Sequence, residues 1–538
     1  MSGQYNWQQK VLAHIWFTYC LAIPKAHFGS QEYLQKFATK AIKTYCADAQ
    51  IRKLIGTWQL TWGCAIYQNN TKVSSSNVND HTMYVAKNTD NTEIDQYVIA
   101  IAGTSPFSLQ NILLENVNVG NATPWNAGQP WKSGETINQD NGQPAVSAGM
   151  CKALKDLTTQ MWDGNLLLLD YLKQVTSQAS KPVEITVAGH SLGGAMAPSL
   201  ALLLVDRQAE WDEKKTATVK VVALAGFSPG NEAFANYYDA TLGDKTDRLW
   251  NQSDIVPNLW EIDGMRKIPG IYEPELPSNI AISVLLKRLE QFSQAQNYTQ
   301  IKRSVPGFPS TFNPSFEIEN ILKKNVVLDQ NVVLDMCAEF LAYPVLLQIK
   351  GMPFLSDDLE SNLTTLFKAF SNDIKEVFDD LIANDTNTED ALKERLSASI
   401  TEFTGIEVNL FFVPVSDRLQ QLFSREEIFS LINYVLQLLY HHTVRYSEYY
   451  GYTEVDRRRE ELTAQVAAQL EQEEAKIQPE NTVIVNYGSA KKDDVDDLLR
   501  GEGKLLKGMS GIMERLKQSG HVSKSAQPVI FLVQKKKD

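Results

Sequence analysis

Residues 183–197 read Val183-Glu-Ile-Thr-Val-Ala-Gly-His-Ser-Leu-Gly-Gly-Ala-Met-Ala197. The apolar and β-branched residues of the first half predict a strand, and the apolar run of the second half predicts a helix. The two segments are joined by Gly189-His-Ser-Leu-Gly193. Glycines at both ends, lacking a Cβ, permit a sharp turn that lifts a serine hydroxyl out of the end of a strand. Ser191 is therefore predicted to be a nucleophile, with His190 packed behind the turn.

The sequence on both sides of this turn alternates between strand and helix patterns. Predicted strands cover residues 58–67, 82–87, 96–102, 183–188, 219–224 and 248–251. Predicted helices cover residues 148–175, 192–205 and 234–238, and a long loop covers 120–143. Strands that alternate with helices indicate an α/β domain, in which helices cover both faces of a sheet. We assign residues 57–275 to this core.

The remaining sequence predicts additional parts around the core. Residues 1–56 have helical periodicity, and residues 276–430 lose the strand pattern and form a helical insertion. Within the insertion, helices are expected at 280–292, 316–349 and 359–382. Residues 431–452 return to the core. A charged appendage follows at 453–538, with a strand–helix–strand pattern at 482–486, 493–517 and 528–533.

Composition and charge exclude several classes of protein. The 538 residues carry a net charge of −13, which argues against general binding to nucleic acid. The five cysteines are scattered without a CxxC pair, so we expect reduced thiols and no structural metal site. No apolar run is long enough for a transmembrane helix, and the best candidate for a signal sequence, 11–23, lacks the flanking features. We expect a protein that is cytoplasmic or exported without a standard signal peptide.

Three further segments carry a resemblance to a known family. They read Y-V-I-A-I-A-G-T at 97–104, F-S-P-G-N-E-A-F-A-N-Y at 227–237 and W-N-Q-S-D-I-V-P at 250–257. Together with the serine turn, they resemble the class 3 (fungal-type) lipases, which have the α/β-hydrolase fold. The resemblance implies that Asp254 is the acid of a catalytic triad and that Thr104 contributes to the oxyanion hole, together with the backbone N–H of Leu192. One departure is Ala102, where the family usually has arginine.

A nucleophilic serine needs a histidine base, which in turn needs a carboxylate partner. In hydrolases of this chain order the histidine follows the acid, which leaves His441, His442 and, less favourably, His521. Tyr440 and Tyr446 stand two residues before and four residues after His442, a spacing that resembles the histidine segment of the family. We therefore predict His442 as the base and keep His441 as the alternative.

The stretch between Asp254 and His442 is much longer than in simple class 3 lipases. The resemblance therefore implies that residues 276–430 form a helical cap near the site. Such a cap could cover a lipid pocket, contact a membrane surface or bind a partner protein.

We predict a serine ester hydrolase, a lipase or phospholipase that cleaves carboxylic esters of lipids through an acyl-enzyme and needs no cofactor or metal. The expected partner is a lipid or acyl-ester substrate, and the appendage could bind a protein. Two alternatives remain: an interaction protein of the same fold with little turnover, and an exported phospholipase effector.

Overall fold

The computed structural model describes residues 5–22, 31–67, 81–103, 119–317 and 425–477, together with residues 333, 337, 482–486, 489–490, 507, 527–531 and 534–535. Thr104 and the predicted helix at 359–382 lie outside these residues, as does nearly all of the predicted helix at 316–349. The chain divides into two compact units, residues 1–463 and residues 464–538.

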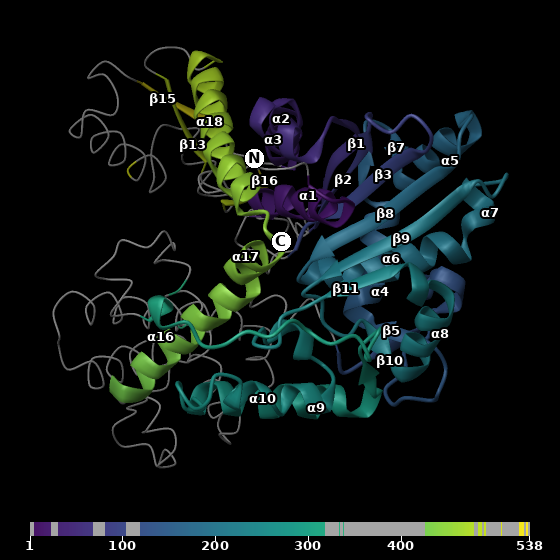
Figure 1. Ribbon diagram of the computed structural model, residues 1–538. Helices are drawn as coiled ribbons and strands as arrows, with labels where there is room; N and C mark the ends of the chain where they lie inside the picture. The colour runs from purple at the N-terminus through teal and green to yellow at the C-terminus, as the bar shows by residue number, and fades with distance from the viewer. Residues whose placement is uncertain are drawn as a thin grey trace. The chain divides into compact units, whose positions relative to one another are not determined.

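The first unit is built on a six-stranded sheet. In spatial order its strands are β1 (Trp58–Tyr67), β2 (His81–Asn88), β3 (Asp95–Ile101), β8 (Val183–His190), β9 (Ala217–Leu224) and β11 (Thr246–Leu249). Strands β1 to β3 are antiparallel, and β3, β8, β9 and β11 are parallel (Figure 1). All six agree with the predicted strands to within a few residues. The parallel strands end at a common edge, where Ile101 pairs with Gly189, and Gly189 pairs with Ala223.

Helices cover both faces of this sheet. The helices of the first part are α1 (Trp7–Ala22), α2 (Gln31–Ala47), α3 (Ala49–Ile55), α4 (Ala148–Thr159), α5 (Leu168–Gln178), α6 (Leu192–Asp206), α7 (Gln208–Trp211) and α8 (Glu232–Leu242). Strand side chains alternate between faces. Ile99 and Val187 therefore share one core with Leu200 of α6, whereas the Tyr84 hydroxyl contacts His14 Nδ1 of α1 at 3.0 Å. The helical character predicted for residues 1–56 is confirmed for α1, α2 and α3.

The single helix predicted at 148–175 is wrong. Helix α4 ends at Thr159, a short hairpin of β6 (Trp162–Asp163) and β7 (Leu166–Leu167) follows, and α5 begins at Leu168. Asp163 pairs with Leu166, so the two residues of the turn are Gly164 and Asn165, with Gly164 in the left-handed region at φ +61°. Asp163 Oδ2 also accepts a hydrogen bond of 3.0 Å from Gly63 N, which ties the hairpin to β1. A Gly-Asn pair in a two-residue loop favours a tight hairpin turn and is the signal that interrupts the helix.

A smaller sheet lies beside the main one, with β12 (Tyr298–Thr299), β10 (Gly230–Asn231), β5 (Ala145–Ser147) and β4 (Ala122–Pro124) in spatial order. The long loop predicted at 120–143 therefore contains one short strand. Strand β12 belongs to the predicted insertion, so that part of the insertion packs on the core. The chain just after β12 also contacts the core, because Phe308 N donates a hydrogen bond to Trp250 O at 2.9 Å.

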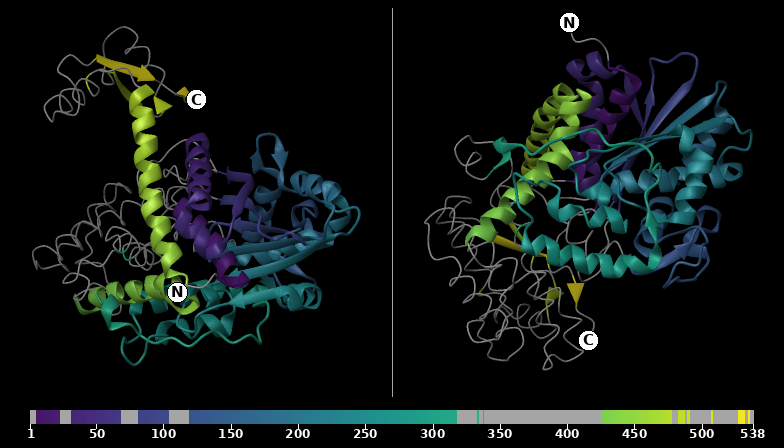
Figure 2. Two further views of the ribbon diagram at one scale, coloured as in Figure 1. Left: turned by 45° about the horizontal axis from the view of Figure 1, so that its top comes forward. Right: turned by 60° about the horizontal axis from the view of Figure 1, so that its bottom comes forward.

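Two helices flank the part of the insertion that lies outside the described residues. Helix α10 (Ile280–Ser293) confirms the helix predicted at 280–292, and α16 (Arg425–Leu439) leads back to the core. Figure 2 shows the teal α10 next to the green α16. The Asn279 side chain joins them by donating to Glu427 O at 3.0 Å and to Glu427 Oε2 at 2.9 Å. These bonds bring together the two ends of the insertion.

The long helix α18 (Thr453–Ile477) begins in the first unit and continues into the second. Its beginning is fixed to the N-terminal helices, since Arg458 pairs with Asp48 at 2.8 Å and Arg459 Nη1 donates to Trp16 O at 2.9 Å. The boundary between the units therefore falls later in the chain than residue 453, where the appendage was predicted to begin.

In the second unit, β13 (Thr482–Asn486) pairs in parallel with β15 (Gln527–Phe531), and β14 (Ser489–Ala490) pairs with β16 (Gln534–Lys535). The strands predicted near 482–486 and 528–533 are confirmed, whereas the helix predicted between them falls almost wholly outside the described residues. Within the described ranges of the whole chain, no helix has the length and apolar character needed to cross a bilayer.

Candidate active site

The serine turn has the strained geometry that its sequence predicts. Ser191 lies between β8 and α6 with φ of +61° and ψ of −123°, a backbone conformation that costs a non-glycine residue about 1–3 kcal/mol. Its N–H donates to Leu224 O at 3.0 Å, which anchors the turn to β9. A Cβ on Gly189 would lie 2.3 Å from Gly193 O, so the turn requires glycine there. The Ser191 side chain makes no capping hydrogen bond to α6, which leaves its hydroxyl uncommitted to the helix.

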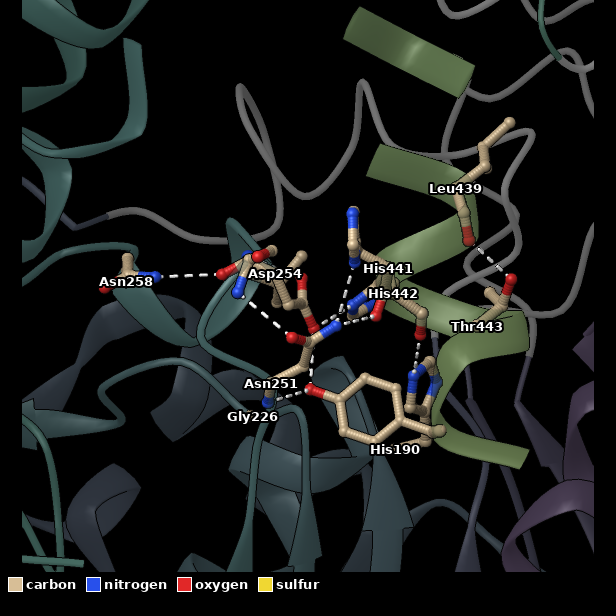
Figure 3. A network of polar contacts seen from close by, with 12 residues as sticks. His190, Gly226, Asn251, Asp254, Asn258, Leu439, His441, His442 and Thr443 are labelled. Carbon is tan, nitrogen blue, oxygen red and sulfur yellow. Dashed lines mark hydrogen bonds and ion pairs between the residues drawn. The ribbon is translucent and has the colours of Figure 1, made fainter. Parts of the chain in front are cut away.

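Asp254 and His442 form the central polar contact of the site. Asp254 follows β11 and is fully buried, and its Oδ2 lies 2.8 Å from His442 Nδ1 (Figure 3). The same carboxylate oxygen accepts a hydrogen bond of 2.8 Å from the Tyr446 hydroxyl, and Oδ1 accepts one of 3.0 Å from Val256 N. The carboxylate is thus held by three donors on two chain segments, which fixes its orientation toward His442.

The two adjacent histidines lie in a π-helical turn, Tyr440–Val444, between α16 and α17 (Arg445–Tyr450). Such turns are rare and occur frequently at functional sites. His190 Nε2 lies 2.7 Å from the His442 carbonyl oxygen, and the two rings are 4.4 Å apart. Burial, together with the neighbouring His442, lowers the pKa of His190 well below its usual value. His190 is therefore neutral and donates through Nε2, which ties the residue before Ser191 to the backbone of His442.

His441 points to different partners. Its Nδ1 lies 3.2 Å from Asn251 Nδ2 and 3.2 Å from Ser310 Oγ, and its ring stacks on Tyr272 with centroids 5.5 Å apart. Burial and, to a lesser degree, the nearby Arg445 lower the pKa of His441 to about 3. The structure therefore brings His442, and not His441, into contact with Asp254.

The predicted oxyanion donors are described only in part. Leu192 is the first residue of α6, where backbone N–H groups lack helical partners and the helix dipole is positive. Thr104 lies outside the described residues. Gly103, immediately before it, lies against the serine turn: a Cβ there would be 2.8 Å from His190 O and 3.3 Å from Ser191 Cβ. The chain therefore passes directly beside Ser191 one residue before Thr104.

Two other residues support the site, and the sequence reasoning did not identify them. Asn251 N donates to the Tyr446 hydroxyl at 3.0 Å, and Asn251 Nδ2 donates to His441 O at 3.0 Å. Asn251 thus contacts both Tyr446, which holds Asp254, and the backbone of His441. Its position three residues before Asp254, in the segment that resembles the family, could have marked it as a residue of the site. Ser310 lies far away in the sequence, and no motif marks it. The described residues contain no cluster of three His, Cys, Asp or Glu side chains that could hold a metal ion.

A family model described as Lipase (class 3) matches residues 109–263, the segment that contains Ser191 and Asp254. The resemblance to the class 3 lipases is confirmed. With the mixed sheet and its two helical layers, this lipase match supports an α/β-hydrolase-like fold and a lipase-type ester hydrolase. A second model, described as a family of unknown function (DUF6200), matches residues 469–538. Comparison with curated protein sequences gives no match.

Several solved lipase structures are similar to the chain. The M37 lipase is 25% identical, with 58% of this chain and 86% of that chain covered and a TM-score of 0.48. A lipase from Rhizopus microsporus var. chinensis is 18% identical, with 48% and 70% covered and a TM-score of 0.30. The Lip2 lipase from Yarrowia lipolytica is 15% identical, with 48% and 76% covered and a TM-score of 0.27.

Proposed function

We propose that this protein is a serine hydrolase that cleaves carboxylic esters of lipids through an acyl-enzyme on Ser191. The observation that carries the proposal is the 2.8 Å contact between His442 Nδ1 and the buried Asp254 carboxylate. His190, the residue before the nucleophile, holds the His442 backbone. The proposal thus assigns the nucleophile to Ser191, the base to His442 and the orienting acid to Asp254.

The contact with Asp254 determines how His442 would act. The carboxylate accepts the Nδ1 hydrogen, which leaves Nε2 unprotonated and able to take the proton of the Ser191 hydroxyl. Ser191 Oγ then attacks the ester carbonyl, and the imidazolium returns its proton to the leaving alcohol. A water molecule, activated by His442 in the same way, hydrolyses the acyl-enzyme.

Charge in this reaction develops on the carbonyl oxygen. The proposal gives the backbone N–H of Leu192 and the predicted donor Thr104 the role of stabilising this oxyanion. Loss of one such donor typically lowers turnover by about 10²–10³. No step of this scheme requires a metal or an organic cofactor.

Tyr446 would keep the acid in place during the cycle. Burial and the adjacent Asp254 raise the pKa of its hydroxyl well above the usual value, so the hydroxyl stays protonated and donates to Asp254 Oδ2. The carboxylate then cannot rotate away from His442 without losing this bond.

The alternative of an interaction protein with little turnover is less well supported. Binding alone needs neither a strained serine at φ +61° nor a buried histidine–aspartate pair. The exported effector, membrane contact through the cap, a protein partner of the appendage and the cellular location all stay predictions from the sequence.

The proposal is tested by covalent labelling and hydrolysis with one matched pair of variants. A fluorophosphonate should label wild type at one site per chain and should leave Ser191→Ala unlabelled. Hydrolysis of p-nitrophenyl esters of graded chain length should fall by about 10⁴ or more in Ser191→Ala. Ser199→Ala, which removes a buried hydroxyl further along α6, should keep both properties. Activity of Ser191→Ala within tenfold of wild type would refute the proposal.

A further inference from the structure

Asp254 and His190 both hold His442, the proposed base. Asp254 fixes the His442 ring at Nδ1, and His190 Nε2 donates a hydrogen bond of 2.7 Å to the His442 carbonyl oxygen (Figure 3). This carbonyl lies in the π-helical turn, where the regular spacing of the backbone hydrogen bonds is interrupted. The placement of the base therefore depends on the placement of the His190 ring.

The buried His190 ring lies among three other aromatic rings. The centroids of His442, Tyr446 and Trp16 are 4.4, 6.0 and 4.9 Å from that of His190. His442 and Tyr446 belong to the segment that His190 itself holds, so they would move together with that segment. Trp16 belongs to α1, a separate part of the chain. Of these three rings, the indole of Trp16 is therefore the one that can support His190 independently of the base.

Trp16 is fixed in turn by the start of α18. Helix α1 lies between the sheet and this end of α18 (Figure 1). The buried Arg459 donates from Nη1 to Trp16 O at 2.9 Å, and the Tyr452 ring lies 5.9 Å from the indole. Arg459 also forms an ion pair with Asp456, one turn earlier in α18. Hydrogen bonds from a guanidinium are charge-assisted and directional. Trp16 is thus held between α18 and the serine turn.

The next residue of α1, Phe17, offers a direct comparison with Trp16. Phe17 is also buried, but its ring lies against His14 at 5.3 Å and Tyr45 at 5.1 Å. Truncation of either aromatic side chain would leave a cavity in the core and lower the stability of the protein. Of the two truncations, only that of Trp16 would also remove a ring that packs on His190. The pair therefore separates general packing from support of the base.

We propose that Trp16 is a positioning residue for the base: its indole keeps the His190 ring in the orientation that donates to the His442 carbonyl. The inference rests on the proposed function of Ser191. Without the indole, the His190 ring could turn, and the His442 backbone would lose a bond that fixes it. A displacement of about 1 Å can cost about 10² in rate. Trp16 lies outside residues 109–263, which match the lipase model, so the inference adds α1 to the catalytic core.

The test measures kcat and KM on one p-nitrophenyl ester for Trp16→Met, with Phe17→Leu as the matched control. Trp16→Met should lower kcat by about 10–10² and keep KM within about twofold, because the placement of the base affects the chemical step rather than binding. The rate of labelling by a fluorophosphonate, which needs the same base, should fall in parallel. Phe17→Leu should keep kcat within about twofold although it also lowers the unfolding temperature. All rates are measured well below the lowest unfolding temperature.

A second measurement asks whether Trp16 acts through His190. His190→Ala removes the donor to the His442 carbonyl and should lower kcat at least as much as Trp16→Met does. In the His190→Ala background, Trp16→Met should cost at most about a further threefold, because effects that pass through one shared residue do not add. If Trp16→Met does not fold, Trp16→Phe takes its place. Its expected loss of about three- to tenfold in kcat should shrink to less than about twofold in the same background.

Three results would each overturn the inference while the proposed function stands: kcat of Trp16→Met within about twofold of wild type, an equal loss of kcat in Phe17→Leu, or losses that add fully in the double variant. Wild type that hydrolyses no ester and takes no fluorophosphonate label refutes the proposed function itself.

Discussion

The π-helical turn Tyr440–Val444 has two sides that differ in chemistry although both are buried. On one side, His442 meets the carboxylate of Asp254. On the other, His441 meets the neutral side chains of Asn251 and Ser310. An imidazolium can form transiently where a carboxylate stabilises it, and is strongly disfavoured where only neutral partners surround a buried ring. Burial alone therefore does not make a histidine a base; contact with the Asp254 carboxylate decides which of the two histidines can take a proton.

The largest expected effect tests this difference directly. His442→Ala should lower kcat by about 10⁴–10⁶, because removal of the base leaves only binding and the oxyanion donors. His441→Ala is the matched control, one residue away in the same turn, and should lose far less. Both are measured as kcat on one p-nitrophenyl ester, with thermal unfolding to check that each variant folds. If the two variants rank the other way, His441 is the base and the assignment of the two sides is wrong.

The next effect concerns the carboxylate that distinguishes the two sides. Asp254→Asn preserves the size of the side chain but replaces an acceptor with a group that can present N–H to His442 Nδ1. The imidazole is then held in the wrong tautomer, and kcat should fall by about 10⁴. The pH–rate profile of the residual activity is the readout that a purely structural role would not alter. An Asp254→Asn protein within tenfold of wild type would contradict the role of the acid.

Much of this site could be predicted from local sequence. The serine turn could be predicted because all of its parts are neighbours in the chain. A strand, the glycines at 189 and 193 and a helix follow one another around Ser191. Asp254 was predicted from the resemblance of its segment, and the spacing around His442 favoured the histidine that the structure places beside it. The bond from His190 to the His442 carbonyl joins residues 252 positions apart, and no local pattern encodes such a contact.

The errors in the fold also have local and non-local causes. The prediction of one helix at 148–175 failed because apolar periodicity was given more weight than the Gly164-Asn165 turn signal. Ser310 could not be foreseen, since its contact with His441 depends on residues of the insertion returning to the core. Periodicity reports which residues are buried, but it does not report which distant segment buries them.

A smaller effect is expected at Tyr446, which supports the acid side of the turn. Tyr446→Phe removes the donor to Asp254 Oδ2 and leaves Asn251 N without its acceptor. We expect a loss of about tenfold in kcat/KM and about 1–3 kcal/mol of unfolding free energy, because a buried donor is left unpaired. Tyr449→Phe is the control, since that side chain is 48% exposed. Unchanged kcat/KM in Tyr446→Phe would show that the carboxylate is held without this hydroxyl.

The smallest effect on catalysis is expected for His441→Gln, which should keep kcat within about threefold of wild type because the residue does not contact Asp254. Its effect should appear in acid stability instead. The pKa of His441 is about 3 in the folded protein, whereas an unfolded histidine titrates near 6.5. Below pH 6.5 the unfolded state therefore binds a proton that the folded state does not, so the contribution is complete above pH 6.5 and is lost as the pH falls toward 3. The slope is about 1.4 kcal/mol per pH unit.

Urea unfolding of wild type and His441→Gln at pH 7, 6, 5.5 and 5 measures this contribution by difference. The buried histidines His14 and His81, whose pKa values are also lowered to about 3, lose stability equally in both proteins and cancel. Glutamine supplies a carbonyl oxygen that Asn251 and Ser310 can reach, so the comparison changes the titration more than the hydrogen bonding. The gap between the two unfolding free energies should shift in favour of the variant as the pH falls. Parallel pH dependences would mean that His441 takes up a proton in the folded protein as readily as in the unfolded one. The neutral partners of His441 would then not prevent its protonation, and the proposed difference between the two sides of the turn would be wrong.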